Sequence, residues 1–93
     1  MDVEYDEDKR RRILAERGLD VALAAEIWEG PHLDFPDMRQ DYRENRIVTV
    51  GYIGARLAIV VWTERGSRRR VISMRKANER EKRKYAPDLA GRD

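Results

Sequence analysis

The chain has 93 residues and no cysteine, so its composition predicts one small domain without disulfides or thiolate metal sites. Its single histidine, His32, is too few for an ordinary zinc site, and we expect neither a metal nor a cofactor. There is no run of about 18 apolar residues and no basic segment followed by an apolar one at the start, so we expect a cytoplasmic protein without membrane span or signal peptide.

The formal net charge of +2 is the balance of two unlike regions. Residues 1–45 contain 13 acidic and 7 basic side chains, whereas residues 64–84 contain 3 acidic and 10 basic ones. This asymmetry favours a polyanionic partner for the second region. A solvated, highly charged surface explains the same counts equally well, so composition alone leaves both interpretations open.

The front of the chain predicts a strand and two helices. Residues 2–5 alternate and favour a short strand, after which Asp6 is expected to cap a helix that ends near Arg17, before Gly18. Asp20 is expected to cap a second helix, which ends at Gly30-Pro31. Helical spacing places four residues on its apolar face: Val21, Ala24, Ala25 and Trp28.

The middle of the chain predicts a β-meander. Residues 31–44 favour a loop with a short strand at 33–35, and three strands follow at 46–52, 57–63 and 70–75. The turns between these three strands are short, which predicts antiparallel neighbours. Residues 57–63 are nearly all apolar, so this strand is expected to be central in the sheet and buried on both faces.

The last predicted element is a helix that begins after Asn78. Glu81 lies three residues on and completes a capping-box pattern, and Pro87 is expected to stop the helix. Residues 1–87 are then a single domain, and residues 88–93 a flexible tail. The order of elements predicts an α+β fold, with helices on one face of an antiparallel sheet and the other face open to a ligand.

Basic side chains concentrate on and beside the last strand. Strict alternation places Arg70 with Met74 on one face, and Arg69 with Ser73 and Arg75 on the other. One of these arginines must therefore share a face with apolar residues, which is costly unless the charge is paired. A guanidinium can also donate two parallel hydrogen bonds to a phosphate.

These residue types suit RNA cleavage. The ribose 2′-hydroxyl attacks the adjacent phosphorus, arginines stabilise the developing charge, Glu64 is a candidate base, and Lys9 or Tyr85 a candidate proton donor. A surface ion-pair network serving solubility accounts for the same residues. Trp28 and Trp62 belong to apolar elements and are interpreted as core residues, and His32 as an ordinary loop residue.

Several motifs occur in an order that resembles a known family over residues 1 to about 85. The front carries Val3-Glu4-Tyr5-Asp6, Lys9 and Gly18, and the middle carries Phe35-Pro36-Asp37, Tyr42, Arg46 and Gly51. The back carries VVWTERG at 60–66, RVISMRKA at 70–77, Glu81 and Tyr85. This ordered set is similar to BrnT, the toxin of BrnT–BrnA toxin–antitoxin systems.

The resemblance implies a RelE-like fold, in which N-terminal helices and a C-terminal helix pack on the antiparallel sheet. It implies an endoribonuclease that needs no metal, arrests translation and is neutralised by a BrnA-like antitoxin, with DNA reached only indirectly through the antitoxin complex. The catalytic positions it implies are Glu64, Arg70 and Arg75, and the RNA contacts are Lys9, Arg46 and Arg80.

The chain also departs from the family pattern. The family usually has Asn near position 13 and Lys-His before the glycine, where this chain has Ile13, Glu16 and Arg17. The alternative hypothesis is therefore a non-catalytic module that uses the same basic face to bind RNA or a protein. A purely structural partner, stable only with another chain, is a third hypothesis.

Overall fold

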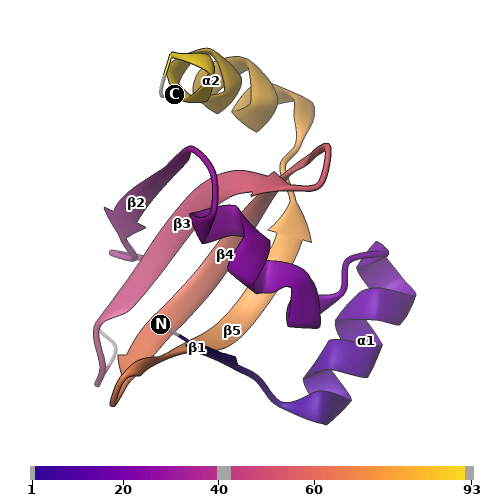
Figure 1. Ribbon diagram of the computed structural model, residues 1–93, viewed down its shortest axis with the longest axis vertical. Helices are drawn as coiled ribbons and strands as arrows, with labels where there is room; N and C mark the ends of the chain where they lie inside the picture. Colours follow the sequence, from indigo (N-terminus) through magenta and orange to yellow (C-terminus); the bar gives the residue numbers. More distant parts are fainter. Residues whose placement is uncertain (1, 40–42, 92–93) are drawn as a thin grey trace.

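The computed structural model describes residues 2–39 and 43–91 and shows an α+β fold built on one five-stranded sheet (Figure 1). The elements are, in chain order, β1 (Asp2–Glu4), α1 (Glu7–Arg17), the 3₁₀ helix η1 (Val21–Trp28), β2 (His32–Pro36), β3 (Arg46–Ile53), β4 (Arg56–Arg65), β5 (Arg68–Lys76) and α2 (Glu79–Ala90). Tyr42, one of the motif residues, lies outside the described residues.

The strand order is β1-β5-β4-β3-β2, which confirms the predicted meander of β3, β4 and β5. β4 is central, and its residues 57–63 are all buried, as their continuous apolar run predicts. The short strand predicted at 33–35 is also present, as β2. One detail differs from the prediction, because β1 pairs with β5 in parallel while the other pairs are antiparallel.

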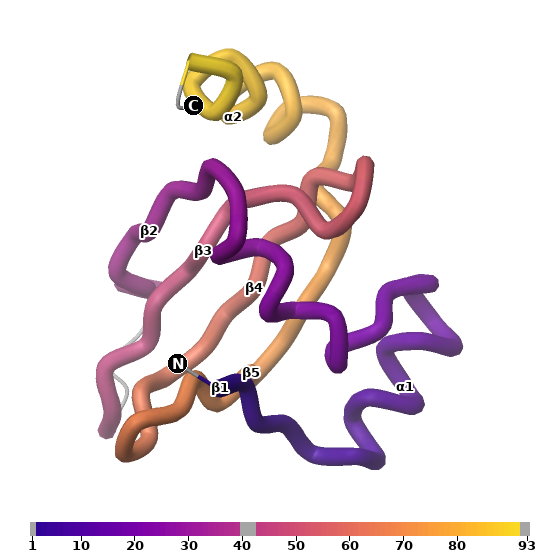
Figure 2. The backbone as a smooth tube through the Cα atoms, in the orientation of Figure 1, coloured from indigo at the N-terminus to yellow at the C-terminus, as the bar shows by residue number. Residues whose placement is uncertain are grey.

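The two faces of the sheet carry separate apolar clusters. η1 and α1 cover what we call the closed face, which includes Val60, Trp62 and Met74. α2 lies over one end of the opposite face, which we call the open face, where Leu89 packs with Val50 and Ile59. The prediction that the helices lie together on one face is therefore wrong for α2. Figure 2 shows α2 and β1 at opposite ends of the sheet.

η1 has the tighter 3₁₀ geometry rather than the predicted α-helical one. Its buried residues are Val21, Ala24 and Ile27, whereas Ala25 is exposed. This spacing of three matches a helix with three residues per turn, in which every third side chain points the same way. η1 approaches β3 so closely that a Cβ on Gly51 would lie 2.6 Å from Ile27 Cγ1.

Strand β5 contains one more residue than β4 at its midpoint. Val61 is opposite Ser73, but the next residue, Trp62, is opposite Val71, so Ile72 forms a bulge. The Lys9 ammonium on α1 donates to the carbonyl oxygen of Ile72 at 2.8 Å. The bulge is therefore held from outside the sheet by a side chain of α1.

α1 makes a second contact of the same kind with the outer edge of β5. Arg17 Nη1 donates to the carbonyl oxygen of Met74 at 2.8 Å. β1 pairs with β5 only at residues 68–70, so these two side chains reach carbonyls beyond the end of that pairing. The basic residues Lys9 and Arg17 thus help to fasten α1 to the sheet.

The capping box predicted at the start of α2 is present, with hydrogen bonds in both directions between Asn78 and Glu81. The predicted end at Pro87 is wrong, because the helix continues to Ala90 with the proline inside it. A proline inside a helix costs about 3 kcal/mol, but burial of Leu89 at 1% exposure stabilises this last turn by about 1.5–3 kcal/mol. Residues 88–90 are therefore helical rather than part of a tail. Within residues 2–39 and 43–91, no helix is long and apolar enough to cross a membrane.

Substituting Gly51 with alanine tests the close approach of η1 to β3. The new methyl group overlaps Ile27 and forces η1 away from the sheet, so we expect a loss of about 1–3 kcal/mol in the free energy of unfolding. Urea unfolding followed by tryptophan fluorescence measures the change. Gly30→Ala is the control, because nothing lies within 4 Å of its added Cβ. Equal effects in the two variants would contradict the packing argument.

Candidate functional site

The open face carries a groove of about 450 Å³ between α2 and the segment that follows β2. Its floor is apolar and is formed by β3 and β4, with β5 contributing Ser73 and Arg75. The apolar floor residues are Val48, Val50, Ile59 and Val61. One wall is α2, through Glu81 and Tyr85. The groove therefore lies on the face of the sheet that α1 and η1 leave uncovered.

Arg75 and Glu81 form a bidentate ion pair in this groove. Arg75 Nη1 and Nη2 donate to the two carboxylate oxygens of Glu81 at 2.8 and 2.9 Å. The Arg75 guanidinium lowers the pKa of Glu81 to about 2, and the pKa of Arg75 is raised by the same contact. The pair is therefore charged at neutral pH, and the guanidinium is held in a fixed orientation.

The opposite wall of the groove combines an aromatic contact with a second ion pair. Phe35 lies 5.7 Å from Tyr85, measured between ring centroids, and so joins β2 to α2. Asp37 is buried and accepts two hydrogen bonds of 2.8 Å from the Arg39 guanidinium. The groove is thus bordered by the cationic groups of Arg39 and Arg75 above an apolar floor.

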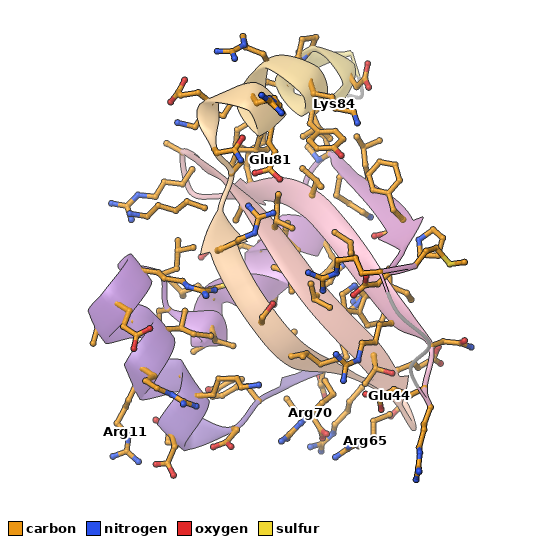
Figure 3. The ribbon with its side chains drawn as sticks, turned by 180° about the vertical axis from the view of Figure 1, so that it is seen from behind. Arg11, Glu44, Arg65, Arg70, Glu81 and Lys84 are labelled. Carbon is orange, nitrogen blue, oxygen red and sulfur yellow. The ribbon has the colours of Figure 1, made fainter. Side chains whose placement is uncertain are left out.

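The open face becomes strongly polar with increasing distance from α2. Strand register places Arg46, Thr63, Arg70 and Glu4 in one row across four strands. Arg70 lies 3.7 Å from Glu4, and Arg46 lies 3.4 Å from Glu44. Figure 3 shows Glu81 beneath α2 at one end of this face and Arg70 and Glu44 toward the other end.

The bulge at Ile72 overturns the expected grouping of the arginines on β5. Beyond the bulge the alternation is reversed, so Arg70 shares the open face with Ser73 and Arg75. Arg69 instead lies on the closed face, where its Cζ is 4.2 Å from the centroid of the Trp28 ring. The arginine that shares an apolar face is therefore Arg69, and an aromatic ring supports its charge.

Both tryptophans lie in the closed-face core, as predicted, and pack edge to face at 5.5 Å between centroids. Arg69 Cζ is also 5.1 Å from the centroid of Trp62. Glu64 is opposite Arg69 in the register, and alternation directs its exposed side chain to this same face. The structure thus brings Arg70 and Arg75 to one face, and Glu64 to the other.

The predicted RNA contacts are in three different places. Arg46 lies on the open face in the row of Arg70, and Arg80 is exposed on α2. Lys9 points to the outer edge of β5, where it binds the Ile72 carbonyl. The sequence analysis identified Glu81 as a capping-box residue and Tyr85 as a candidate proton donor. It missed Asp37 and Arg39, whose pairing had no signal beyond the Phe35-Pro36-Asp37 motif.

The low pKa of Glu81 predicts how stability depends on pH. Its value falls from 4.5 in an ordinary glutamate to about 2 beside Arg75, so the ionised group stabilises the folded state above about pH 4.5. That stabilisation is lost as the pH falls from 4.5 toward 2. Glu81→Gln is therefore expected to be less stable than the parent at pH 7, with a difference that shrinks across this range.

Urea unfolding of both proteins at pH 7 and at pH 2.5 measures this effect. Glu79→Gln is the matched control, since Glu79 is exposed and its one ion pair among the described residues is with Lys82, at 3.2 Å in the same helix. A stability difference between parent and Glu81→Gln that is the same at both pH values would contradict the role of the Arg75 ion pair.

Comparison with known proteins identifies the family. No curated protein sequence matches the chain. A family profile described as the ribonuclease toxin BrnT of type II toxin–antitoxin systems matches residues 5–81, which include α1, η1, the four strands β2 to β5 and the start of α2. Among the described residues, no three His, Asp or Glu side chains form a group suited to a metal. The chain belongs to the BrnT family of ribonuclease toxins of type II toxin–antitoxin systems.

Proposed function

We propose that the groove on the open face cleaves RNA without a metal ion, with Arg75 as its principal catalytic residue. The observation that carries this proposal is the Arg75 guanidinium, fixed by Glu81 above an apolar floor and facing the same side as Arg70 and Arg46. Family membership implies a ribonuclease, and this groove supplies cationic donors where a phosphate and its flanking bases would lie.

The proposed reaction uses the substrate's own 2′-oxygen. This oxygen forms a bond to the adjacent phosphorus, its proton passes to water in the open groove, and the bond from phosphorus to the 5′-oxygen breaks. Negative charge builds up on the phosphate oxygens in the transition state. Donors that are already held in place stabilise this charge without reorganising, and Glu81 holds the Arg75 guanidinium in this way.

Arg75 retains donors for the phosphate while it holds Glu81. Its Nη1 and Nη2 atoms bind Glu81, and Nη1 also approaches the Lys76 carbonyl oxygen at 3.5 Å. The Nε–H and the second proton of Nη2 lie along the other edge of the guanidinium, which is a fork suited to two phosphate oxygens. Arg70 lies two rows further along the open face and is proposed to contact the same RNA strand.

Glu81 and Tyr85 have different proposed roles. A carboxylate whose pKa is about 2 is a weak base, so Glu81 is a positioning residue that orients Arg75. Tyr85, on the wall of the groove, is the proposed proton donor to the departing 5′-oxygen. Glu64 has no part in this proposal, because its side chain lies on the other face of the sheet.

The wider role follows from the family. We propose that cleavage arrests translation in the cytoplasm, that a BrnA-like antitoxin neutralises the toxin, and that the toxin meets DNA only through that complex. The RelE-like assignment of the fold also stays a prediction. The α+β architecture and the mostly antiparallel sheet are compatible with it.

A non-catalytic binding module is the second candidate. Arg17 stands where the family usually has histidine, and its guanidinium is committed to the Met74 carbonyl on the edge of β5. A module of this kind would bind RNA or a protein on the open face and leave RNA intact.

Substitution of Arg75 tests the active site. Arg75→Ala is expected to lower the rate of RNA cleavage by about 10²-fold or more, and to relieve growth arrest when the chain is expressed without antitoxin. Arg75→Lys keeps the charge but loses the fork, so an intermediate rate is expected. Arg11→Ala is the control, because Arg11 is exposed on α1 and pairs only with Asp8 among the described residues. Full toxicity of a folded Arg75→Ala protein would exclude this groove as the active site.

The use of the 2′-hydroxyl is tested separately. Cleavage of a short RNA is expected to continue in excess EDTA, and to stop when a single 2′-deoxynucleotide replaces the nucleotide on the 5′ side of the cut. Mass spectrometry of the products shows whether the phosphate remains on the 3′ end of the upstream fragment. Loss of cleavage in EDTA would contradict a metal-independent reaction, and intact RNA in all conditions would favour the binding module.

A further inference from the structure

Three arginines share a single carboxylate at the hairpin end of the open face. The Nη1 atoms of Arg65, Arg68 and Arg70 lie 3.7, 3.8 and 3.7 Å from the carboxylate oxygens of Glu4. These distances correspond to charge attraction rather than to short hydrogen bonds. One carboxylate cannot provide a fork for three guanidinium groups, so most of their donors remain available to another anion.

The cluster lies on the same face as the groove. Alternation from Thr63 along β4 directs Arg65 to the open face, and Arg68 is opposite Arg65 on β5. Figure 3 shows Arg65 and Arg70 together at the end of the sheet away from α2. The side chains of Arg65 and Arg68 are 61% and 57% exposed, which makes them accessible to a ligand that crosses this face.

The spacing along β5 matches an extended nucleic-acid backbone. Arg75, Ser73, Arg70 and Arg68 occupy four successive rows of the open face. Neighbouring rows are about 7 Å apart, because side chains on one face are two residues apart along a strand and a strand rises about 3.4 Å per residue. Arg75 and Arg68 are therefore separated by about 20 Å, which is close to the span of four phosphates in an extended single strand.

We propose that Arg65, Arg68 and Arg70 form a second phosphate site, which binds the backbone of the same RNA about three nucleotides from the phosphate at Arg75. This inference rests on the proposed function of the groove. The substrate is then a single strand, because the groove beside Arg75 has an apolar floor and is bordered by the rings of Phe35 and Tyr85. Such a floor accepts the faces of unpaired bases, which a duplex keeps stacked inside.

Glu4 has an opposing role at this site. Its carboxylate occupies the point on which the three guanidinium groups converge, so a phosphate must displace it or share the cations with it. Removing the charge of Glu4 is therefore expected to tighten RNA binding, whereas removing the arginines weakens it. Opposite effects from neighbouring residues distinguish a phosphate site from general surface charge.

The experiment measures binding of a fluorescent 2′-O-methyl RNA of about eight nucleotides, which cannot be cleaved because it lacks the attacking hydroxyl. Replacing both Arg65 and Arg68 with glutamine is expected to weaken binding about tenfold and to reduce the slope of log K against log salt by about 1.4, that is 0.7 for each phosphate contact. Glu4→Gln is expected to bind several-fold more tightly. A probe of about three nucleotides spans one site only and should bind the parent and the double variant alike.

The matched control replaces Arg11 and Arg12, two exposed arginines of α1, with glutamine, which changes the net charge by the same amount. Thermal unfolding confirms that each variant is folded. Equal weakening by the two double variants, or an unchanged affinity with Arg65 and Arg68 replaced, would overturn the second site. Unchanged RNA affinity together with weakened antitoxin binding would assign the cluster to the protein interface instead.

The use of an uncleavable probe separates this inference from the proposed function. If the parent cleaves no RNA, but the probe binds and loses affinity only with Arg65 and Arg68 replaced, the second site stands and the catalytic proposal fails. If the parent cleaves RNA and the probe binds all variants equally, the catalytic proposal stands and the second site is rejected.

Discussion

Between Val61 and Trp62 of β4, strand β5 accommodates one residue more than its partner, and the arrangement of the open face depends on that bulge. Without it, Arg70 would share the closed face with Trp62, and Arg69 would take its place beside the groove. The buried Val71 would also leave the closed-face core for the open face, which would expose its apolar side chain to water. The Lys9 ammonium donates to the Ile72 carbonyl, a backbone acceptor that lies beyond the end of the pairing between β1 and β5.

The Glu81 carboxylate both helps to form α2 and orients Arg75, the candidate catalytic arginine. Glu81 accepts a hydrogen bond from the Asn78 backbone amide, and this capping interaction contributes about 1 kcal/mol to a helix. It also accepts two hydrogen bonds from Arg75. Correct formation of the first turn of α2 and correct placement of the Arg75 guanidinium are therefore one event, which links local helix formation to the chemistry of the groove.

The sequence predicts those features that depend on local or periodic signals. The apolar run of β4, the alternation of β3 and the capping box of α2 are all present as expected. The family was also recognised from its ordered motifs. The grouping of Arg70 with Arg75 was not predicted, because a single extra residue in a strand has no local sequence signal and reverses every side chain beyond it.

Other differences arose where tertiary contacts outweighed local preference. Pro87 is a strong stop signal, yet Leu89 is buried against the open face and holds the last turn in place. The pairing of Asp37 with Arg39 depends on the path of the chain after β2, which places the carboxylate under the groove wall. Alternation assigns a face to each arginine, but only the register between strands shows which of them meet.

The outer edge of β5 has a consequence for how this protein associates with others. An uncovered edge strand presents backbone carbonyls and amides to which a strand of another molecule can add, a common route to aggregation. Here Lys9 and Arg17 already occupy the carbonyls of Ile72 and Met74. A strand from another molecule would have to displace both cationic side chains before it could pair with β5. Lys9 and Arg17 therefore oppose edge-to-edge pairing between copies of the chain.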